Sequence, residues 1–162
     1  QMDALTFLPN RRMIIRELQD EVLRAERYHT QFSISLVDVD HFKKVNDSHG
    51  HLTGDEVLRQ VGAKLKEQIR HPDLAGRYGG EEFAVILPGT ANAGAFHFCE
   101  RLRLSIESAS VTAHKQIVKF TSSFGIAEID DETEDAHAWL ERADQALYRA
   151  KTSGRNQTRV YE

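Results

Sequence analysis

The chain has 162 residues and a formal net charge of −4; 40% of its residues are hydrophobic and 28% are charged, a balance typical of a soluble globular protein. At this length we expect one domain, residues 1–162, that buries roughly 70% of the surface of the unfolded chain. The negative charge excludes attraction of polyanions by a global field, and no apolar run approaches the roughly 20 residues of a membrane span. We therefore expect neither nucleic acid nor membrane as a partner of this segment.

Cysteine usage and the start of the chain set two further bounds. Cys99 is the single cysteine, which excludes an internal disulfide and fits a reducing, cytoplasmic compartment. It lies among apolar residues of an expected helix, so we interpret it as a buried structural thiol. The sequence starts abruptly at Gln1-Met2, two residues before a structured motif, and we expect a module of a longer protein.

Helical and strand patterns alternate from the first structured residues onward. Pro9-Asn10 introduces a helix predicted over Arg11–Tyr28, with Asn10 as its N-cap. Phe32–Val39 alternates apolar residues with serines and ends apolar, which indicates a strand. The apolar residues of the helix recur at helical spacing and should face the core: Ile14, Leu18, Val22 and Ala25.

The middle of the chain predicts two helices separated by a loop. A short helix is expected over His41–Asn46, and Asp47–Gly54, with its two glycines, is expected to be a loop. A long helix should follow over about Asp55–Arg70 and end before Pro72. Its apolar face comprises Val57, Leu58, Val61, Leu65 and Ile69.

The last part of the chain predicts a hairpin followed by alternating elements. Leu74–Tyr78 and Glu82–Leu87 are expected to pair as a β-hairpin. Trp139, on the last helix, should pack in the hydrophobic core of the domain. The later elements are a helix over Asn92–Ser108, a long strand over Ile117–Ile129, a helix over Ala136–Ser153 with Gly154 as C-cap, and a short strand over Gln157–Tyr161. Together the elements predict one α/β (α+β) domain with a mixed sheet.

The turn of this hairpin, Arg77–Phe83, carries the most information about function. Gly79-Gly80 permits positive φ and a tight turn, and it clears side-chain bulk where a large anion could approach. Glu81 and Glu82 follow directly. Carboxylates beside such a gap are poor partners for phosphate unless a divalent cation lies between them. The turn therefore indicates metal-dependent nucleotide chemistry.

A second acidic cluster, Asp38-Val39-Asp40, lies at the carboxyl end of its strand, where open α/β sheets present ligand-binding residues. Period-2 alternation points Asp38 and Asp40 to one face. Magnesium prefers one or two carboxylates together with substrate phosphate, which Asp38 and Glu81 supply if their strands are neighbours. Structural interpretations also exist: Asp38 and, more readily, Asp40 could cap the next helix, and Glu82 could support the turn.

Further motifs accompany these two clusters. The whole set is Asp3-Ala4-Leu5-Thr6, Asn10-Arg11-Arg12, Asp38–Lys43, Asn46-Asp47, Gly50-His51, Gly54-Asp55, Arg77–Phe83, and Ala150-Lys151 with Gly154-Arg155-Asn156. Their order and spacing resemble those of the GGDEF family of bacterial diguanylate cyclases, from Asp3 to about Asn156. Phe7 departs from the pattern, because the family usually has glycine there. We expect Phe7 to affect domain orientation or packing and not chemistry.

The resemblance implies a fold and a reaction. The family's fold is similar to that of the class III nucleotide cyclases and the polymerase palm, a central mixed five-stranded sheet flanked by helices. Its members join two GTP molecules into cyclic di-GMP and release two pyrophosphates. Two domains, each holding one GTP, face each other as a homodimer about a two-fold axis. The 3′-hydroxyl of each GTP then attacks the α-phosphate of the other.

The resemblance also assigns the catalytic side chains, Asp38, Glu81 and Glu82. Asp38, the Val39 carbonyl and Glu81 would hold Mg²⁺ or Mn²⁺, two ions in each half-site, with Glu82 assisting or binding the second ion. Metal coordination lowers the pKa of the attacking hydroxyl, so no side chain is an obligatory dedicated base.

Guanine selection would depend on Asn46 and Asp55. Guanine presents two adjacent donors, N1–H and an exocyclic amine, whereas adenine offers an acceptor at N1, and a site built on such bonds can reject the wrong partner by up to roughly 10⁴-fold. Leu5 and Leu58 would pack on the faces of the ring. The alternative for Asp55 is the N-cap of the second long helix.

Phosphate binding is expected from backbone N–H groups at the start of the short helix, from three cations and from the open glycine turn. These residues are His41, Phe42, Lys43, Lys151, Arg155, Gly79 and Gly80. Lys151 and Arg155 could instead complement the C-terminus of the last helix.

An Arg-x-x-Asp motif, Arg70 to Asp73, lies just before the hairpin. In the family this motif at this spacing is the inhibitory product site. Its arginine can bind phosphate or the guanine edge bidentately, and its aspartate accepts from guanine. Arg101, on the following helix, would complete the site from a neighbouring domain. By itself the motif is a weak signal, which a surface ion pair would explain.

Two alternatives to the cyclase stay open. A catalytically silent member of the family would bind GTP or cyclic di-GMP as a signalling receptor, but such members usually lose an acidic residue of the turn, and Glu81 and Glu82 are intact. An enzyme that makes other cyclic dinucleotides is opposed by Asp55. We also expect a covalently linked upstream sensor domain in the full-length protein.

Overall fold

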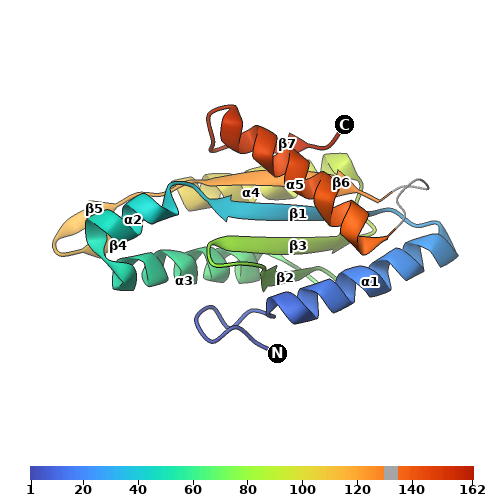
Figure 1. Cartoon of the computed structure of the whole chain (residues 1–162), viewed down its shortest axis with the longest axis horizontal. Coiled ribbons are helices and arrows are strands. Elements are labelled where there is room, and N and C mark those ends of the chain that lie inside the picture. The colour runs from blue at the N-terminus through green and yellow to red at the C-terminus, as the bar shows by residue number, and fades with distance from the viewer. Residues whose placement is uncertain (130–134) are drawn as a thin grey trace.

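Five strands form the central sheet of the computed structural model, which describes residues 1–129 and 135–162 (Figure 1). Their spatial order is β2-β3-β1-β6-β7. Neighbouring strands are antiparallel except β6 and β7, which are parallel, so the sheet is mixed as expected. The strands are β1 (Phe32–Val39), β2 (Leu74–Arg77), β3 (Glu82–Pro88), β6 (Ser122–Glu128) and β7 (Thr158–Val160).

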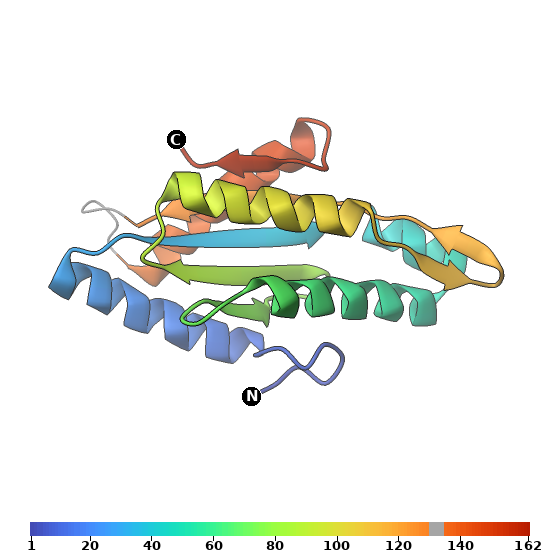
Figure 2. The ribbon, with the colours of Figure 1, turned by 180° about the vertical axis from the view of Figure 1, so that it is seen from behind.

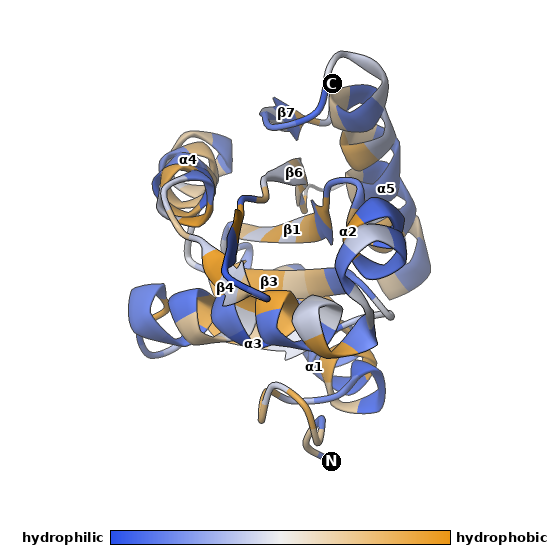
Figure 3. Cartoon of the chain, turned by 90° about the vertical axis from the view of Figure 1, so that its left-hand side faces the viewer, coloured by the Kyte–Doolittle hydropathy of each residue, from blue (hydrophilic) through white to orange (hydrophobic). Residues whose placement is uncertain are grey.

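Helices cover both faces of this sheet (Figures 1 and 2). α1 (Arg11–Tyr28) and α5 (Ala136–Thr152) pack on one face, and α3 (His51–Gln68) and α4 (Asn92–Glu107) pack on the other. Figure 3, turned to look along the strands, shows the two helix layers on opposite sides. α2 (Phe42–His49) lies beyond the carboxyl end of β1, beside the start of α3.

The sheet shares one apolar cluster with α1 and α5. Ile14, Leu18 and Trp139 are fully buried there, as predicted. Trp139 Nε1 also donates a hydrogen bond to the carbonyl oxygen of Ala127 at 2.8 Å, which satisfies the polar atom of a buried ring. The remaining apolar positions of α1 are partly buried: Val22 and Ala25.

A second cluster joins α3 and α4 to the opposite face. Its predicted α3 members are buried: Val57, Leu58, Val61 and Leu65. Ile69, just after the end of α3, is partly buried. Cys99 on α4 is fully buried, and burial raises the pKa of its thiol to about 12, which agrees with a structural thiol. Of the helices in residues 1–129 and 135–162, none combines the length and the apolar character of a membrane span.

The register of the sheet brings two acidic segments together. β1 and β3 run antiparallel, with Asp38 directly opposite Glu82. Antiparallel pairing places the carboxyl end of one strand at the amino end of the other. The residues that end β1 therefore meet the residues that begin β3, which is the condition that the sequence set for a shared metal.

The junction of α2 and α3 differs from the expected loop. The sequence predicts a loop over Asp47–Gly54, but α2 continues to His49 and α3 begins at His51. Gly50 alone, with φ 90°, separates them. A single glycine suffices because positive φ redirects the chain without steric cost. Asp55 therefore lies inside α3, and its interpretation as a helix N-cap is wrong.

The long strand predicted over Ile117–Ile129 is divided in the structure. β5 (Gln116–Val118) pairs with β4 (Val111–Ala113) in a separate two-stranded sheet, and β6 follows on its own. His114 and Lys115 connect β4 to β5 with φ 49° and 66°, as in a type I′ turn. The sequence does not predict this turn, because His-Lys lacks the glycine and asparagine that are preferred in such turns.

Phe7 has a left-handed backbone, with φ 58°. Glycine adopts this region freely, whereas a residue with a Cβ loses about 1–2 kcal/mol there, which explains why glycine suits this position. The Phe7 ring is 66% exposed, and Lys66 Nζ lies 5.7 Å from its centroid. Phe7 therefore acts on the local backbone and on surface packing; an effect on domain orientation stays a prediction.

An alanine variant is usually more stable than the glycine variant at the same position, and at Phe7 this order of stability should be reversed. Phe7→Gly relieves the left-handed backbone and Phe7→Ala does not, so the glycine variant should have the larger free energy of unfolding by about 1 kcal/mol. Both variants lose the same contact with Lys66, so that contact cancels. Urea denaturation of the two variants measures the difference.

Leu23 provides the matched control, because it is 63% exposed and lies inside α1. At that position the alanine variant should be the more stable by about 1 kcal/mol, as in any exposed helix interior. Greater stability of alanine at both positions would contradict strain at Phe7.

Candidate functional site

The acidic side chains that the sequence groups together lie where β1 ends and β3 begins. The Val39 N–H donates to the Glu81 carbonyl oxygen at 3.2 Å, which extends the pairing of the two strands into the turn. Asp38 is 6% exposed, whereas Glu81 and Glu82 are half-buried. The sheet therefore holds three carboxylates beside one another.

All three carboxylates have a raised pKa. Burial is the largest cause of the raised pKa of Asp38, Glu81 and Glu82. Negative neighbours add to it, because Asp40 raises the pKa of Asp38, and Asp38 raises that of both glutamates. Lys151 lowers all three pKa values. A site with this balance favours the binding of positive charge.

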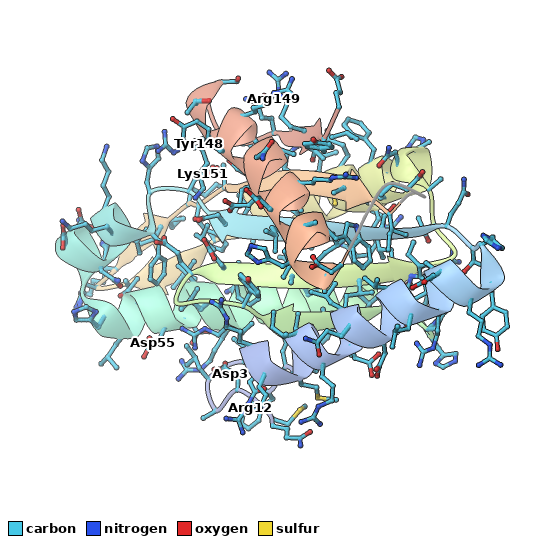
Figure 4. The ribbon with its side chains drawn as sticks, turned by 45° about the vertical axis from the view of Figure 1, so that its right-hand side comes forward. Asp3, Arg12, Asp55, Tyr148, Arg149 and Lys151 are labelled. Carbon is cyan, nitrogen blue, oxygen red and sulfur yellow. The ribbon has the colours of Figure 1, made fainter. Side chains whose placement is uncertain are left out.

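A lysine from the last helix partly neutralises the cluster. Lys151 Nζ donates to Asp38 Oδ2 at 2.5 Å. Lys151 lies in the last turn of α5, and Figure 4 shows it on the α5 side of the strand ends, with Asp55 of α3 on the other side. Because its ammonium points at Asp38, a role confined to the C-terminus of the helix does not account for it.

A cavity of about 200 Å³ opens beside this ion pair. Most residues predicted for metal and phosphate binding line it, although they come from β1, α2, the hairpin turn and the end of α5. The lining comprises Asp38, Val39, Asp40, His41, Phe42, Lys43, Glu81, Lys151 and Arg155. Glu82 and the two turn glycines, Gly79 and Gly80, do not line it.

The start of α2 presents backbone donors to the cavity. The first helical hydrogen bond runs from the Val45 N–H to the His41 carbonyl oxygen at 3.2 Å. The N–H groups of His41, Phe42 and Lys43 precede this bond and have no acceptor within the helix. An anion in the cavity would meet these donors together with the cations of the lining.

The oxygen atoms of the cavity suit a hard divalent cation. Asp38, the Val39 carbonyl and Glu81 are oxygen donors of the kind that Mg²⁺ prefers. Over the described residues 1–129 and 135–162, no group of three or more His, Cys, Asp or Glu side chains could hold a metal ion by itself. Mg²⁺ commonly binds one or two carboxylates and completes its coordination with substrate phosphate and water. The donor set therefore fits an ion that shares its ligands with a nucleotide.

Arg77 supports the glycine turn through hydrogen bonds to its carbonyl oxygens. Its Nε donates to the Gly79 carbonyl oxygen at 3.2 Å, and its Nη2 donates to the Gly80 carbonyl oxygen at 2.7 Å. Asp3 accepts from Arg77 Nη1 at 3.1 Å and from the Thr6 N–H at 2.8 Å. Sequence reasoning found Asp3 and Arg77 within motifs but gave neither a role, because no local pattern links two residues so far apart.

Gly79 and Gly80 do not adopt positive φ, so the expectation of a left-handed glycine turn is wrong. The hydrogen bonds from Arg77 hold the turn in an ordinary backbone conformation instead. A Cβ added at Gly80 would meet no atom within 4 Å, whereas one at Gly79 would approach Glu82 Oε2 to 3.2 Å. The turn is therefore open at Gly80, as the expected approach of a large anion requires.

The residues predicted for guanine binding lie where α2 meets α3. Asn46 Oδ1 is buried and has no hydrogen-bond partner among the described residues; a Cβ at Gly54 would lie only 1.9 Å from it. A buried oxygen without a partner is rare and fits a donor brought by a ligand. Asp55 follows on α3 and is half-buried. Leu58 is only 2% exposed, so the half-buried Leu5 offers more surface to a ring.

The Arg-x-x-Asp segment forms a turn after α3. The Asp73 N–H donates to the Arg70 carbonyl oxygen at 2.6 Å, and the Arg70 N–H donates to Asp73 Oδ2 at 3.4 Å. These bonds involve the backbone of Arg70, and Arg70 is an exposed residue. Burial raises the pKa of Asp73. Arg101 is exposed on α4, with its guanidinium 5.4 Å from the Phe98 ring centroid.

A mixed sheet with helix pairs on both faces, acidic side chains at adjoining strand ends and cations across a small cavity defines a nucleotide-cyclase type of α/β domain. Residues 1–157 match the family described as "Diguanylate cyclase, GGDEF domain". The chain belongs to this family.

Individual relatives agree with this assignment. The diguanylate cyclase DgcP of Pseudomonas aeruginosa is 40% identical over 98% of this chain and 23% of its own length. The response regulator PleD of Caulobacter vibrioides is 44% identical over 95% of this chain and 34% of its own length. The chain thus spans a quarter to a third of these curated relatives.

Solved structures show the same fold. The GGDEF domain of DgcB from Caulobacter crescentus, solved in complex with c-di-GMP, superposes with a TM-score of 0.96 at 37% identity, covering 99% of this chain and 93% of that one. The active GGEEF domain of a diguanylate cyclase from Vibrio cholerae gives a TM-score of 0.90 at 33% identity, covering 96% of this chain and 98% of that one.

Proposed function

We propose that this chain is the cyclase domain of a diguanylate cyclase, which condenses two GTP molecules into cyclic di-GMP and releases two pyrophosphates. The observation that carries the proposal is the convergence of Asp38, Glu81 and Lys151 on one cavity beside the start of α2. Acidic oxygens and cations at such close quarters suit a metal ion and a polyphosphate bound together. Membership of the family supports the same reaction.

Mg²⁺ or Mn²⁺ is the cofactor that fits these donors. We assign Asp38, the Val39 carbonyl and Glu81 to hold two ions in each half-site, with Glu82 assisting. When bound, the ions would neutralise charge on the phosphates and lower the pKa of the attacking hydroxyl. Asp38 and Glu81 serve to keep that charge beside the triphosphate, and none of the cavity residues is needed as a dedicated base.

The triphosphate would be oriented by both backbone and side chains. Lys43, Lys151 and Arg155 supply positive charge around the cavity, and the N–H groups of His41 and Phe42 supply directed donors. The hairpin turn of Gly79 and Gly80, which is open at Gly80, would leave room for the phosphates to approach. Phosphoryl transfer depends mainly on positioning and on charge stabilisation of this kind.

One domain provides half of the reaction centre. In-line displacement requires a 3′-hydroxyl opposite the leaving pyrophosphate, and we propose that a second copy of the chain brings it on its own GTP. A homodimer with the two cavities facing each other about a two-fold axis meets this requirement. Cyclic di-GMP is symmetric, which agrees with two equivalent attacks.

Guanine would be selected by Asp55 and Asn46. The Asp55 carboxylate can accept from guanine N1–H and the exocyclic amine together. The buried Asn46 Oδ1, which has no hydrogen-bond partner among the described residues, can accept from a further donor of the ligand. Adenine would place an acceptor against the carboxylate. Leu5 and Leu58 complete the assignment as apolar contacts of the ring.

Cyclic di-GMP would also inhibit the enzyme at Arg70 and Asp73. Arg70 is exposed, and its hydrogen bond with Asp73 holds its backbone in a turn. The turn therefore presents the guanidinium to solvent. Arg101 from a neighbouring domain would complete the site. The C. crescentus structure of DgcB contains c-di-GMP, which agrees with product binding in this family.

We further propose that an upstream sensor domain controls the reaction, since the curated relatives extend well beyond the matched part and PleD is a response regulator. We also propose a cytoplasmic location, which GTP as substrate and the unpaired Cys99 thiol support. A silent GTP or cyclic di-GMP receptor is the second candidate, but Glu81 and Glu82 favour the enzyme.

Incubation of the domain with GTP and Mg²⁺ should yield cyclic di-GMP and pyrophosphate, resolved by chromatography. Glu81→Gln should lower the rate by about 1000-fold or more, because it weakens the hold on ions that supply several kcal/mol of transition-state stabilisation. Glu67→Gln, on the exposed side of α3, is the control and should leave the rate unchanged.

Specific activity should also rise with enzyme concentration, because two domains must meet. GTP binding without any product across this range would reject the cyclase in favour of the silent receptor. Full activity in Glu81→Gln would reject the assignment of Glu81.

Asp55→Ser should relax the preference for GTP over ATP. The serine removes the paired acceptor for guanine and the repulsion of adenine N1, so the ratio of kcat/KM for the two nucleotides should fall by about 100-fold. Glu56→Ser, one residue further along α3, is the control. An unchanged ratio in Asp55→Ser would defeat the assignment.

Arg70→Ala should escape product inhibition. Added cyclic di-GMP should slow the wild type, and the variant should keep its initial rate because it lacks the guanidinium for phosphate or guanine. Arg59→Ala, which removes an exposed arginine of α3 paired with Glu56, is the control and should stay inhibited. Equal progress curves for the wild type with and without product would contradict the inhibitory site.

A further inference from the structure

Asp40 is a buried carboxylate that the proposed reaction does not use. It is 5% exposed, and three donors surround it. Its Oδ2 accepts from Thr121 Oγ1 at 2.7 Å and from the Asn156 N–H at 3.0 Å. Its Oδ1 accepts from Ser123 Oγ at 2.7 Å. The sequence interpretation of Asp40 as a helix cap is wrong, because His41 occupies the N-cap position of α2 and no side chain caps that helix.

Asp40 connects three separate parts of the chain. It follows β1 directly, Thr121 and Ser123 lie at the start of β6, and Asn156 follows α5. The Asp40 N–H also donates to the Thr121 carbonyl oxygen at 2.9 Å. The carboxylate is thus held rigidly by the sheet, and the Asn156 N–H is its one contact with the segment after α5.

That segment has a backbone that needs support. Gly154, Arg155 and Asn156 have φ of 113°, 62° and 48°. Left-handed backbone is unfavourable for residues that carry a Cβ, and consecutive residues hold it only when surrounding contacts compel them. Arg155 is one of the cations that line the cavity. Its guanidinium is placed by this backbone together with a hydrogen bond from Nη1 to the Lys151 carbonyl oxygen at 3.4 Å.

Asn156 is held from two sides. Its Oδ1 accepts from Arg103 Nη1 at 3.0 Å, and its Nδ2 donates to Glu107 Oε2 at 2.5 Å; both partners lie on α4. Its backbone N–H donates to Asp40 on the opposite side. Of these contacts of Asn156, the one with Asp40 acts on the backbone itself. The backbone of the neighbouring Arg155 is held by Ala150, whose carbonyl oxygen accepts from its N–H at 3.0 Å, and by Gln157 Nε2, which donates to its carbonyl oxygen at 3.1 Å.

We propose that Asp40 is a positioning residue: through the Asn156 N–H it fixes the left-handed segment 154–156 and so holds Arg155 over the cavity. Although Asp40 lines the cavity, we assign it to neither the nucleotide nor a metal ion, because its oxygens accept from the hydroxyls of Thr121 and Ser123 and from the Asn156 N–H. The inference rests on the proposed function for the identity of the anion, a nucleoside triphosphate.

Binding of 3′-deoxy-GTP with Mg²⁺ tests the proposal without turnover, since this nucleotide lacks the attacking hydroxyl. Asp40→Ala should raise its Kd about tenfold, the effect of one misplaced charged contact. Asp40→Asn should raise the Kd less than about threefold, because its amide oxygen can still accept from Asn156. If Asp40 were a metal ligand, the asparagine variant would be as defective as the alanine variant.

The effect of Asp40 should disappear when Arg155 is absent. In an Arg155→Ala background, Asp40→Ala should change the Kd by less than about twofold, as expected of residues that act as one unit. Asp135→Ala is the control for lost stability, because it removes the N-cap bond to the Ala138 N–H at the other end of α5. It should lower Tm and leave the Kd unchanged.

Amide hydrogen exchange without nucleotide provides a second readout. The Arg155 N–H donates to the Ala150 carbonyl oxygen at 3.0 Å and not to Asp40, so its exchange reports the conformation of the segment. It should exchange faster in Asp40→Ala and near the wild-type rate in Asp40→Asn.

Unchanged exchange of the Arg155 amide in Asp40→Ala would overturn the inference. Additive effects on Kd in the Arg155→Ala background would also overturn it. If the wild type binds 3′-deoxy-GTP but makes no cyclic di-GMP from GTP, the proposed reaction fails, while the affinity and exchange comparisons still decide the role of Asp40.

Discussion

The crowding of the partly buried carboxylates of Asp38, Glu81 and Glu82 at adjoining strand ends is the constraint on which the functional end of this molecule depends. The pairing of β1 with β3 sets Asp38 opposite Glu82, so the carboxylates cannot separate without breaking the sheet. Burial raises their pKa values, and negative neighbours add to it: Asp40 for Asp38, and Asp38 for both glutamates. A raised pKa means that the folded chain binds protons more tightly than the unfolded chain, so this contribution to stability falls as the pH rises through the interval between the two values. A positively charged ligand that binds the folded chain at this site restores the stability that is lost at higher pH.

Other carboxylates near the site show the opposite environment. Burial acts to raise the pKa of Asp3, but hydrogen bonds from Thr6 and the charge of Arg77 outweigh it and lower the pKa. Asp40 is likewise surrounded by three donors. Acids of this kind are satisfied by the protein and hold loops in place, whereas Asp38 and its neighbours are left with too few donors. The number of donors around each carboxylate therefore separates the groups that build the cavity from the groups that act in it.

Local patterns predicted much of the fold. Caps and apolar periodicity predicted α1 with the observed bounds, because α1 buries one regular face. The alternating and finally apolar run predicted β1 with the observed bounds, and β1 is buried along its whole length. The prediction failed at the His114-Lys115 turn, which lacks the usual glycine and asparagine, and at the Gly50 junction, where one glycine takes the place of the longer loop that was expected. Motif spacing named the acids and cations that the structure places around one cavity. It could not predict the roles of Arg77 and Asp40, whose partners Asp3 and Asn156 lie 74 and 116 residues away in the sequence.

The balance of acidic and basic side chains around the cavity is the physical reason for proposing that a metal ion and a triphosphate bind there together. A free triphosphate would meet the unneutralised charges of Glu81 and Glu82, and a free divalent ion would have to displace Lys151 from Asp38. In the proposed complex Asp38 would help to hold the ion, and Lys151, which pairs with Asp38 in this structure, would then be available to the phosphate. Each charged group then exchanges one partner for another and none is left buried without one, which is the condition for charges to be tolerated in a half-buried site.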